Sequence, residues 1–224
     1  MERLICLLLG YAFGNFPTGY LYAKAHGVDI TKTGSGNVGT TNALRTLGPK
    51  AGLATLLGDF AKTLIPLFIT SWLFREQTDM RYLLTVYTGL GAILGHNFPL
   101  TLGFHGGKGV ACTGGLIIYS DPVLMGVCAL LFIGGTAITR YVSFGSLLVA
   151  AGYLITNIVL VLSGRHMGWN ASEPLGPQYH TELFILVFLI SALIVFQHRS
   201  NIHRLLTGTE RKLSFGGGSR KEQS

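Results

Sequence analysis

Charged residues are scarce in this sequence of 224 residues: Asp, Glu, Lys and Arg together make up 12% of it, against roughly 25% in soluble domains. Cysteine is also rare, with three residues, all in apolar surroundings. The shortage of charge excludes an ordinary soluble domain, a disordered chain and a coiled coil. Three irregularly spaced cysteines exclude a disulfide framework and argue against a zinc site. Hydrophobic residues make up 49% of the chain, which indicates a multi-pass membrane protein.

Apolar segments recur along the whole chain. A helix needs roughly 20 apolar residues to cross a bilayer core of about 30 Å, and we expect an all-α membrane bundle with about seven transmembrane helices. The first segment has no clear signal-peptide cleavage site, so we interpret it as a retained helix. The fourth and seventh are short, so five or six crossings remain compatible with the sequence. The seven segments are residues 4–21, 51–74, 81–96, 110–119, 123–139, 141–163 and 182–197.

The distribution of positive charge predicts the orientation of this bundle. With seven crossings, three polar stretches fall on one side of the membrane: residues 24–50, 97–109 and 198–224. That side carries twelve of the 17 Lys and Arg residues, and the opposite side carries four, with Lys62 inside a helix. Because Lys and Arg concentrate in cytoplasmic loops, we expect the N-terminus outside and the C-terminus in the cytoplasm.

The domain organisation is expected to be simple, because no internal repeat is visible. We expect a single integral-membrane domain over residues 1–212. Residues 213–224 contain a run of glycines among polar residues, which predicts a flexible C-terminal tail.

The first polar stretch contains a glycine-rich loop. Gly34, Gly36 and Gly39 stand within six residues, and such spacing lets backbone N–H groups face an anion. Residues 40–42 can begin a helix, whose N-terminus attracts phosphate, and Arg45 adds a cation that can hold phosphate bidentately. We interpret the stretch as a phosphate site. The alternative is a polar loop whose arginine anchors at the lipid headgroups.

The second polar stretch combines His96 with a second glycine cluster between Gly103 and Gly109. It resembles a nucleotide phosphate loop, but the spacing before Lys108 is too short, and Gly109 stands where Ser or Thr would bind magnesium. We therefore predict an anion nest with one lysine instead of a nucleotide–magnesium site. The alternative is a re-entrant turn eased by glycine, with Lys108 reaching toward the interface.

The third polar stretch begins the C-terminal region. His198, Asn201 and Leu205 share one face of a predicted helix at spacings of three and seven residues, and Gly208 is a plausible helix stop. Histidine and asparagine on one face favour a polar functional site. The alternative is a basic tail that lies on anionic lipid.

Asp59 and Lys62 lie three residues apart within the second apolar segment. Ions inside a membrane are costly and are normally paired. We expect a buried structural pair that supports the first polar loop, with a substrate or ion site as the functional alternative.

The three polar stretches resemble, in type, order and side, the three motifs of the bacterial acyl-phosphate:glycerol-3-phosphate acyltransferase family, the PlsY family. Residues 35–45 are similar to its first motif, residues 96–109 to its second and residues 198–210 to its third. The similarity extends over almost the whole chain. Two positions depart from the pattern: Thr40 stands where the family usually has Ala, and His105 stands where it usually has another Lys.

The resemblance implies a multi-pass enzyme of the bacterial inner membrane that works at the cytoplasmic face. It would move a fatty acyl group from acyl phosphate to the 1-hydroxyl of glycerol 3-phosphate, giving lysophosphatidic acid and phosphate in the first acylation of phospholipid synthesis. Its partners would be these two substrates and membrane lipid, with no nucleic acid and no obligate protein partner. Because acyl phosphate is already activated, no metal, cofactor or enzyme nucleophile is expected, and positioning with electrostatic stabilisation would suffice.

The resemblance also implies residue roles. His198 would either take the hydroxyl proton as a general base or orient glycerol 3-phosphate while the departing phosphate takes the proton, and we favour orientation. Glu210 is expected to support Arg or Lys side chains. The expected catalytic residues are Ser35, Arg45, Lys108, His198 and Asn201. The residues expected to bind substrate or phosphate are Gly36, Asn37, Gly39, Asn42, His96, Gly106, Gly107, Gly109, Arg204 and Glu210.

Two other functions fit parts of the sequence. A small multi-pass transporter for a phosphate-bearing solute would explain the helices and the Asp59–Lys62 pair. Transporter sites lie near the bilayer midplane, however, whereas the glycine-rich stretches gather at one face. An alcohol phosphotransferase that uses a nucleotide-linked lipid would require clustered carboxylates for a metal, and the expected active face carries only Asp29, Glu210 and Glu222.

Overall fold

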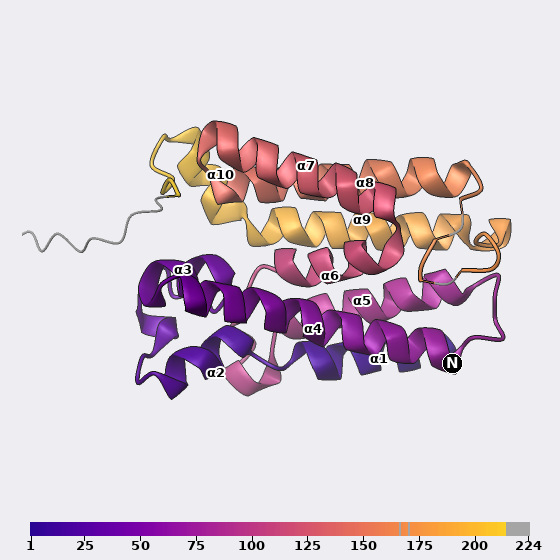
Figure 1. The fold of residues 1–224 in the computed structure, drawn as a ribbon, viewed down its shortest axis with the longest axis horizontal. Helices are drawn as coiled ribbons and strands as arrows, with labels where there is room; N and C mark the ends of the chain where they lie inside the picture. Colours follow the sequence, from indigo (N-terminus) through magenta and orange to yellow (C-terminus); the bar gives the residue numbers. More distant parts are fainter. Residues whose placement is uncertain (166, 170, 214–224) are drawn as a thin grey trace, which may run out of the picture.

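The structure, a computed structural model, describes residues 1–165, 167–169 and 171–213. These residues form α-helices, short 3₁₀ turns and no strand (Figure 1), which confirms the all-α prediction. The expected tail over 213–224 lies outside the described residues except for Leu213. The helices are α1 (Glu2–Gly14), α2 (Thr18–Ala25), α3 (Thr40–Leu47), α4 (Pro49–Leu73), α5 (Arg81–Asn97), α6 (Val110–Ser120), α7 (Pro122–Thr139), α8 (Val142–Leu162), α9 (His180–Gln197) and α10 (Arg199–Leu206).

Each predicted apolar segment is helical, but the lengths differ. Within the part of the chain that the structure describes, five stretches are long and apolar enough to cross a membrane: Glu2–Ala25, Pro49–Leu73, Pro122–Thr139, Val142–Leu162 and Pro177–Gln197. Helices α5 and α6, with 17 and 11 residues, are shorter than this. The expected number of seven crossings therefore stays a prediction.

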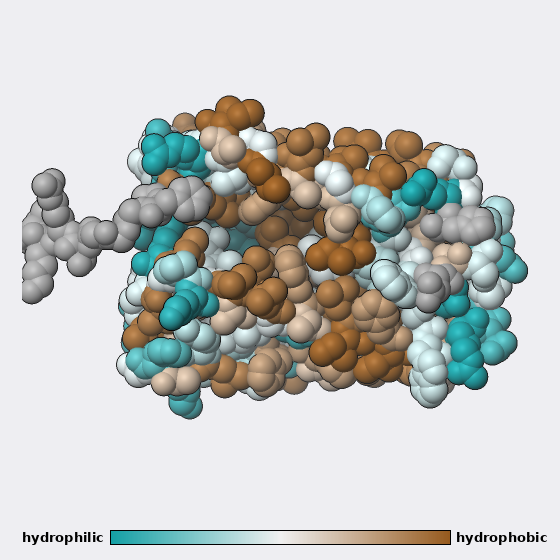
Figure 2. Space-filling view, in the orientation of Figure 1, coloured by the Kyte–Doolittle hydropathy of each residue, from teal (hydrophilic) through white to brown (hydrophobic). Residues whose placement is uncertain are grey.

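The outer surface has the character of a membrane protein. Figure 2 shows an apolar band across the middle of the molecule, with hydrophilic residues gathered at both ends. Helix α7 illustrates the band, because Leu130 is 73% exposed and Ile138 is 86% exposed. Large aliphatic side chains with this exposure over a continuous surface require a lipid surrounding.

The first predicted helix is interrupted, which corrects the continuous segment expected over residues 4–21. Helix α1 ends at Gly14 and α2 begins at Thr18, because Pro17 has no N–H to donate and disfavours helical geometry in the residue before it. The polar groups at the interruption form hydrogen bonds with residues from distant segments. Asn15 Oδ1 accepts from Leu100 N at 2.7 Å, and Lys62 Nζ donates to Phe16 O at 3.0 Å. Non-helical backbone at membrane depth requires such partners.

Glycines allow α1 and α5 to pack backbone against backbone. A Cβ on Gly10 would lie 1.9 Å from Thr88 O, and a Cβ on Gly91 would lie 2.1 Å from Leu7 O. Small residues at helix interfaces are a common device of membrane bundles. This close contact places the end of α5, which carries His96, beside the α1–α2 interruption.

The three polar stretches meet at one end of the bundle, as predicted (Figure 1). A turn separates α6 from α7 at Asp121, whose carboxylate caps α7 by accepting from Val123 N at 2.6 Å. At the polar end, Leu213 N donates to Arg140 O at 2.7 Å, so the last described residue is held against the α7–α8 turn. The side of the membrane on which this end lies stays a prediction.

Candidate active site

A cavity of about 1500 Å³ opens where the three polar stretches meet. Figure 2 shows this hollow between the upper and lower halves of the molecule. Its polar part brings together residues that are far apart in the sequence, such as Ser35 and Glu210. Every residue expected to act in catalysis lines it: Ser35, Arg45, Lys108, His198 and Asn201.

Asn42 holds the first motif together. Its side-chain nitrogen donates to Thr33 O at 3.0 Å and to Asn37 O at 2.8 Å, while its oxygen accepts from Ser35 N at 2.9 Å. Asn42 is 4% exposed. It is therefore a loop organiser, although the sequence suggested that it would contact phosphate. The loop that it shapes leaves the Ser35 side chain exposed at the cavity.

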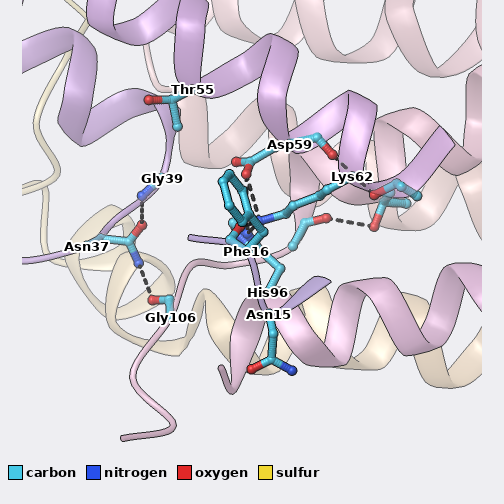
Figure 3. A network of polar contacts seen from close by, with 12 residues as sticks. Asn15, Phe16, Asn37, Gly39, Thr55, Asp59, Lys62, His96 and Gly106 are labelled. Carbon is cyan, nitrogen blue, oxygen red and sulfur yellow. Dashed lines mark hydrogen bonds and ion pairs between the residues drawn. The ribbon is translucent and has the colours of Figure 1, made fainter. Parts of the chain in front are cut away.

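Asn37 joins the first motif to the second. Its side-chain nitrogen donates to Gly106 O at 3.3 Å, and its oxygen accepts from Gly39 N at 3.0 Å (Figure 3). A single side chain thus fixes two loops relative to each other. Its expected role in substrate binding becomes, in this geometry, one of positioning.

The glycine amides do not form the open anion nests expected from the sequence. Gly106 N donates to Asn97 O at 3.1 Å, and Gly107 N donates to His96 O at 3.0 Å. In the first motif, Gly36 N donates to Thr33 O at 3.1 Å. The nest prediction is therefore wrong for these three amides, because each has a partner within the protein. The amides of Thr40 and Thr41 at the start of α3, and of Val110 and Ala111 at the start of α6, have no partner inside their helices and can face an anion at the cavity.

Gly107 is required for a reason other than the approach of an anion. A Cβ at this position would lie 1.9 Å from His96 Nε2. We expect Gly107→Ala to push the imidazole aside and to lower kcat/KM about tenfold, with a lower melting temperature. Steady-state kinetics and thermal unfolding measure both effects. Gly126→Ala is the matched control, since a Cβ on Gly126 of α7 meets nothing within 4 Å. An unchanged melting temperature in Gly107→Ala would contradict this packing role.

The third motif forms a polar chain with the second. Lys108 Nζ donates to Asn201 Oδ1, and Asn201 Nδ2 donates to Glu210 at 2.7 Å. Glu210 also accepts from Arg204 Nε at 2.7 Å and from Ser143 at 2.8 Å. The predicted role of Glu210, support of a basic side chain, is confirmed at Arg204. Ser143, on α8, carried no signal in the sequence.

Burial changes the ionisation of two groups in the cavity. Burial lowers the pKa of Lys108 to about 8. The attraction of Glu210 partly offsets this effect, whereas repulsion from Arg204 and Arg45 lowers the pKa further. Burial likewise lowers the pKa of His198 to about 4. Near neutral pH, the free protein therefore holds a charged Lys108 beside a neutral His198.

His198 has a defined tautomer. Its Nδ1 lies 2.8 Å from Ile194 O. Because a carbonyl oxygen can only accept, Nδ1 carries the proton, and Nε2 is left as an acceptor. Its position one turn before Asn201 on the cavity wall agrees with the predicted shared face.

Asp59 and Lys62 form the predicted buried ion pair, with 2.8 Å between Nζ and the carboxylate. We expected the pair to support the first polar loop. Its contacts instead support the α1–α2 interruption and the second motif. Lys62 Nζ reaches Phe16 O at 3.0 Å and His96 Nδ1 at 2.8 Å (Figure 3). The inclusion of His96 was not visible in the sequence, because it depends on the packing of α4 against α5.

The cavity continues into an apolar groove between α4, α6 and α7. The residues of this groove are typical of any membrane helix and carry no signal of their own in the sequence. Its walls are hydrocarbon, and it leads from the polar end toward the apolar band of the surface. The side chains along it include Phe60, Ile117, Ile118, Met125, Phe132 and Ile133.

A lipid transferase needs these two compartments, with cations where a phosphate group lies and hydrocarbon where a chain lies. Comparisons with known proteins narrow this class. Residues 4–208 match the family model described as Glycerol-3-phosphate acyltransferase. The chain is 39% identical over 213 residues to a glycerol-3-phosphate acyltransferase of Geobacter sulfurreducens, covering 95% of this chain and 98% of that protein. It is 38% identical over 220 residues to one of Clostridioides difficile, covering 98% and 97%.

Two solved structures of PlsY, an integral membrane glycerol 3-phosphate acyltransferase, have the same fold. The glycerol 3-phosphate form matches with a TM-score of 0.79 and the lysophosphatidic acid form with 0.76, each at 33% identity over 96% of both chains. The chain therefore belongs to the glycerol-3-phosphate acyltransferase family. This confirms the family resemblance, the multi-pass membrane fold and the acyltransferase activity predicted from the sequence.

Proposed function

We propose that the chain transfers a fatty acyl group from acyl phosphate to the 1-hydroxyl of glycerol 3-phosphate. The hydroxyl oxygen attacks the acyl carbon, the bond from that carbon to the phosphate oxygen breaks, and the hydroxyl proton passes to the departing phosphate. The products are lysophosphatidic acid and phosphate. The observation that carries this proposal is the continuity of a cationic cavity with an apolar groove, which suits one substrate with both a chain and a phosphate.

Arg45 and Lys108 are the proposed phosphate-holding cations. Arg45 and Arg204 act electrostatically on Lys108, so positive charge from all three motifs converges on one region. Ser35 offers a hydroxyl donor at the tip of the first loop. Catalysis then consists of holding two anionic substrates in contact and stabilising the charge that develops on the acyl oxygen.

His198 and Asn201 are the proposed partners of glycerol 3-phosphate. Neutral His198 can accept from a substrate hydroxyl through Nε2 and so orient its oxygen toward the acyl carbon. Asn201 is bonded on both sides, to Lys108 and Glu210, and therefore fixes the lysine relative to the helix α10. These two residues place the hydroxyl beside the cation that binds phosphate.

We place the active site on the cytoplasmic face of the bacterial inner membrane, in a single domain with seven crossings. The positive charge at the polar end supports this orientation. Helices α5 and α6 are short, but α5 is mostly buried against α1 and α4, so it can cross within the bundle without matching the lipid thickness.

The direct test uses purified protein, acyl phosphate and radiolabelled glycerol 3-phosphate in the presence of a chelator. Labelled lysophosphatidic acid, formed without added metal or nucleotide, is the expected result. Replacing acyl phosphate by acyl-coenzyme A should give no product if the phosphate region recognises the donor. Uptake of labelled glycerol 3-phosphate into proteoliposomes without lipid product would favour a transporter and overturn the proposal.

The low pKa of Lys108 predicts a basic limb in the pH profile. Its ammonium group is charged below about pH 8 and neutral above it, so kcat/KM, which reports the free enzyme, should fall as the pH rises through 8. Lys108→Arg keeps a charge at every accessible pH and should remove this fall, although its absolute rate is lower. A basic limb that persists unchanged in Lys108→Arg would contradict the assignment.

A further inference from the structure

Three ionisable side chains meet beneath the floor of the cavity: Asp59 and Lys62 from α4, and His96 from α5 (Figure 3). Lys62 Nζ lies 2.8 Å from the Asp59 carboxylate and 2.8 Å from His96 Nδ1. The three residues are 2%, 5% and 6% exposed. Because buried polar groups must match donor to acceptor, this arrangement fixes where the protons lie.

Lys62 determines the tautomer of His96. An ammonium group offers only donors, and Lys62 is ion-paired with Asp59. His96 Nδ1 therefore has to accept the hydrogen bond from Lys62, and the ring proton has to lie on Nε2. The ion pair thus converts His96 into a neutral donor.

The Nε2–H group is directed toward the second motif. A Cβ on Gly107 would lie 1.9 Å from Nε2, so the imidazole edge packs directly beneath this glycine. Both His96 and Gly107 line the cavity, next to Lys108. Nε2 of His96 has no hydrogen-bond partner among residues 1–165, 167–169 and 171–213. The donor is available to a bound molecule.

His96 and His198 have opposite tautomers. The Nδ1 atom of His198 faces the Ile194 carbonyl oxygen at 2.8 Å and must donate, whereas Nδ1 of His96 faces the Lys62 ammonium and must accept. Of these two rings, His198 therefore presents a nitrogen that accepts and His96 a nitrogen that donates. The difference comes entirely from the group behind each ring.

We propose that Asp59 and Lys62 are positioning residues that hold His96 as an Nε2–H donor to an anionic oxygen of the bound substrates. The oxygen belongs either to a phosphate group or to the acyl carbonyl as it becomes an oxyanion. The inference rests on the proposed function and adds to it a donor whose tautomer is set from inside the membrane domain.

A metal centre is the other chemistry that this cluster suggests. The possible ligand atoms of Asp59, His96 and Cys112 lie within 4.8 Å of one another. Lys62 Nζ, however, occupies the position from which a cation would contact both Asp59 and His96. The residues therefore do not fit a metal ion, and the lysine supplies the positive charge.

The tautomer can be measured directly on the full chain in lipid nanodiscs. With ¹⁵N-labelled histidine, NMR distinguishes protonated from bare ring nitrogens, and His96→Gln and His198→Gln identify the two signals. We expect Nε2–H and bare Nδ1 for His96, and the reverse for His198. A protonated Nδ1 at His96 would overturn the proposal. This measurement needs no turnover, so it separates failure of this proposal from failure of the proposed function.

Kinetics then test the donor role. His96→Leu should lower the rate about a hundredfold, the effect of losing one donor to a developing oxyanion, whereas His96→Gln keeps an N–H and should stay within about tenfold of wild type. If only kcat falls, the acceptor of the His96 hydrogen bond is the developing oxyanion. If KM for one substrate rises, the acceptor is the phosphate group of that substrate. Equal losses in both variants, or no loss in His96→Leu, would contradict a donor role.

Lys62→Met tests the positioning role, because it keeps the stem and removes the ammonium. We expect a mixture of His96 tautomers and a rate about tenfold lower. Thr70→Val is the control, since Thr70 is a buried hydroxyl on the same helix, bonded to Thr88 at 2.7 Å and remote from the cavity. A reduced rate in Lys62→Met with the wild-type tautomer retained would contradict the proposal. If Lys62→Met does not fold, the NMR measurement of the His96 tautomer in the wild-type protein decides whether the proposal holds.

Discussion

Replacing Arg45 by alanine is expected to lower kcat/KM at least a hundredfold while the protein remains folded. Arg45 lies on α3, in the helix that residues 40–42 begin, and its side chain is exposed at the cavity. Its guanidinium group donates a hydrogen bond to Arg211 O at 3.1 Å. Hydrogen bonds to charged groups contribute about 1.5–3 kcal/mol each, and a bidentate grip on phosphate has two of them.

The measurement is the steady-state rate with each substrate varied in turn, together with the melting temperature. Arg45→Lys should fall between wild type and Arg45→Ala, because a lysine keeps the charge but not the planar fork. Lys32→Ala is the matched control, since it removes an exposed cation of the same stretch that is paired with Asp29 at 3.5 Å. More than half of the wild-type activity in Arg45→Ala would rule out a phosphate-holding role.

The helices were predictable where local chemistry decides them. The turn before α7 follows from Asp121 and Pro122, a capping carboxylate and a residue suited to the first helical position. The interruption between α1 and α2 was less predictable. Asn15 and Pro17 weaken the helix locally, but its actual break depends on acceptors and donors from residues 62 and 100, far away in sequence.

The site was predicted as a set of residues but not as a mechanism of binding. Charge counting and helix parity brought the three motifs to one end, because both depend only on the order of segments. The glycine amides could not be assigned in this way. Whether Gly106 and Gly107 face an anion or the carbonyl oxygens of Asn97 and His96 depends on how the loop folds back on α5.

Residues without a polar signature were also missed. The groove residues Phe60, Ile117 and Phe132 are typical of any membrane helix, so their shared cavity emerges only from packing. The Asp59–Lys62 pair was recognisable from spacing, since carboxylate and ammonium at i and i+3 pair on a helix. Its third member, His96, comes from another helix and could not be inferred.

Replacing His198 by alanine is expected to lower the rate about a hundredfold or more, and the form of its pH dependence decides the role. The free protein holds His198 with a pKa of about 4, because burial disfavours its charged form. The imidazole is thus neutral above about pH 4 and charged below it. An acid limb of kcat/KM near 6.5, the unperturbed value, is therefore not expected. Bound phosphates raise this pKa, so a limb in kcat would lie higher.

Such a weakly basic imidazole is a poor final proton acceptor but a good hydrogen-bond acceptor. We therefore expect His198 to orient the hydroxyl while the departing phosphate takes its proton. His198→Gln keeps an acceptor atom and should retain a rate within about tenfold of wild type, with the acid limb of kcat unchanged. The profile of this variant at saturating substrate is the decisive measurement. An acid limb that disappears together with a loss of at least about a hundredfold, the contribution of a positioned base, would make His198 the general base.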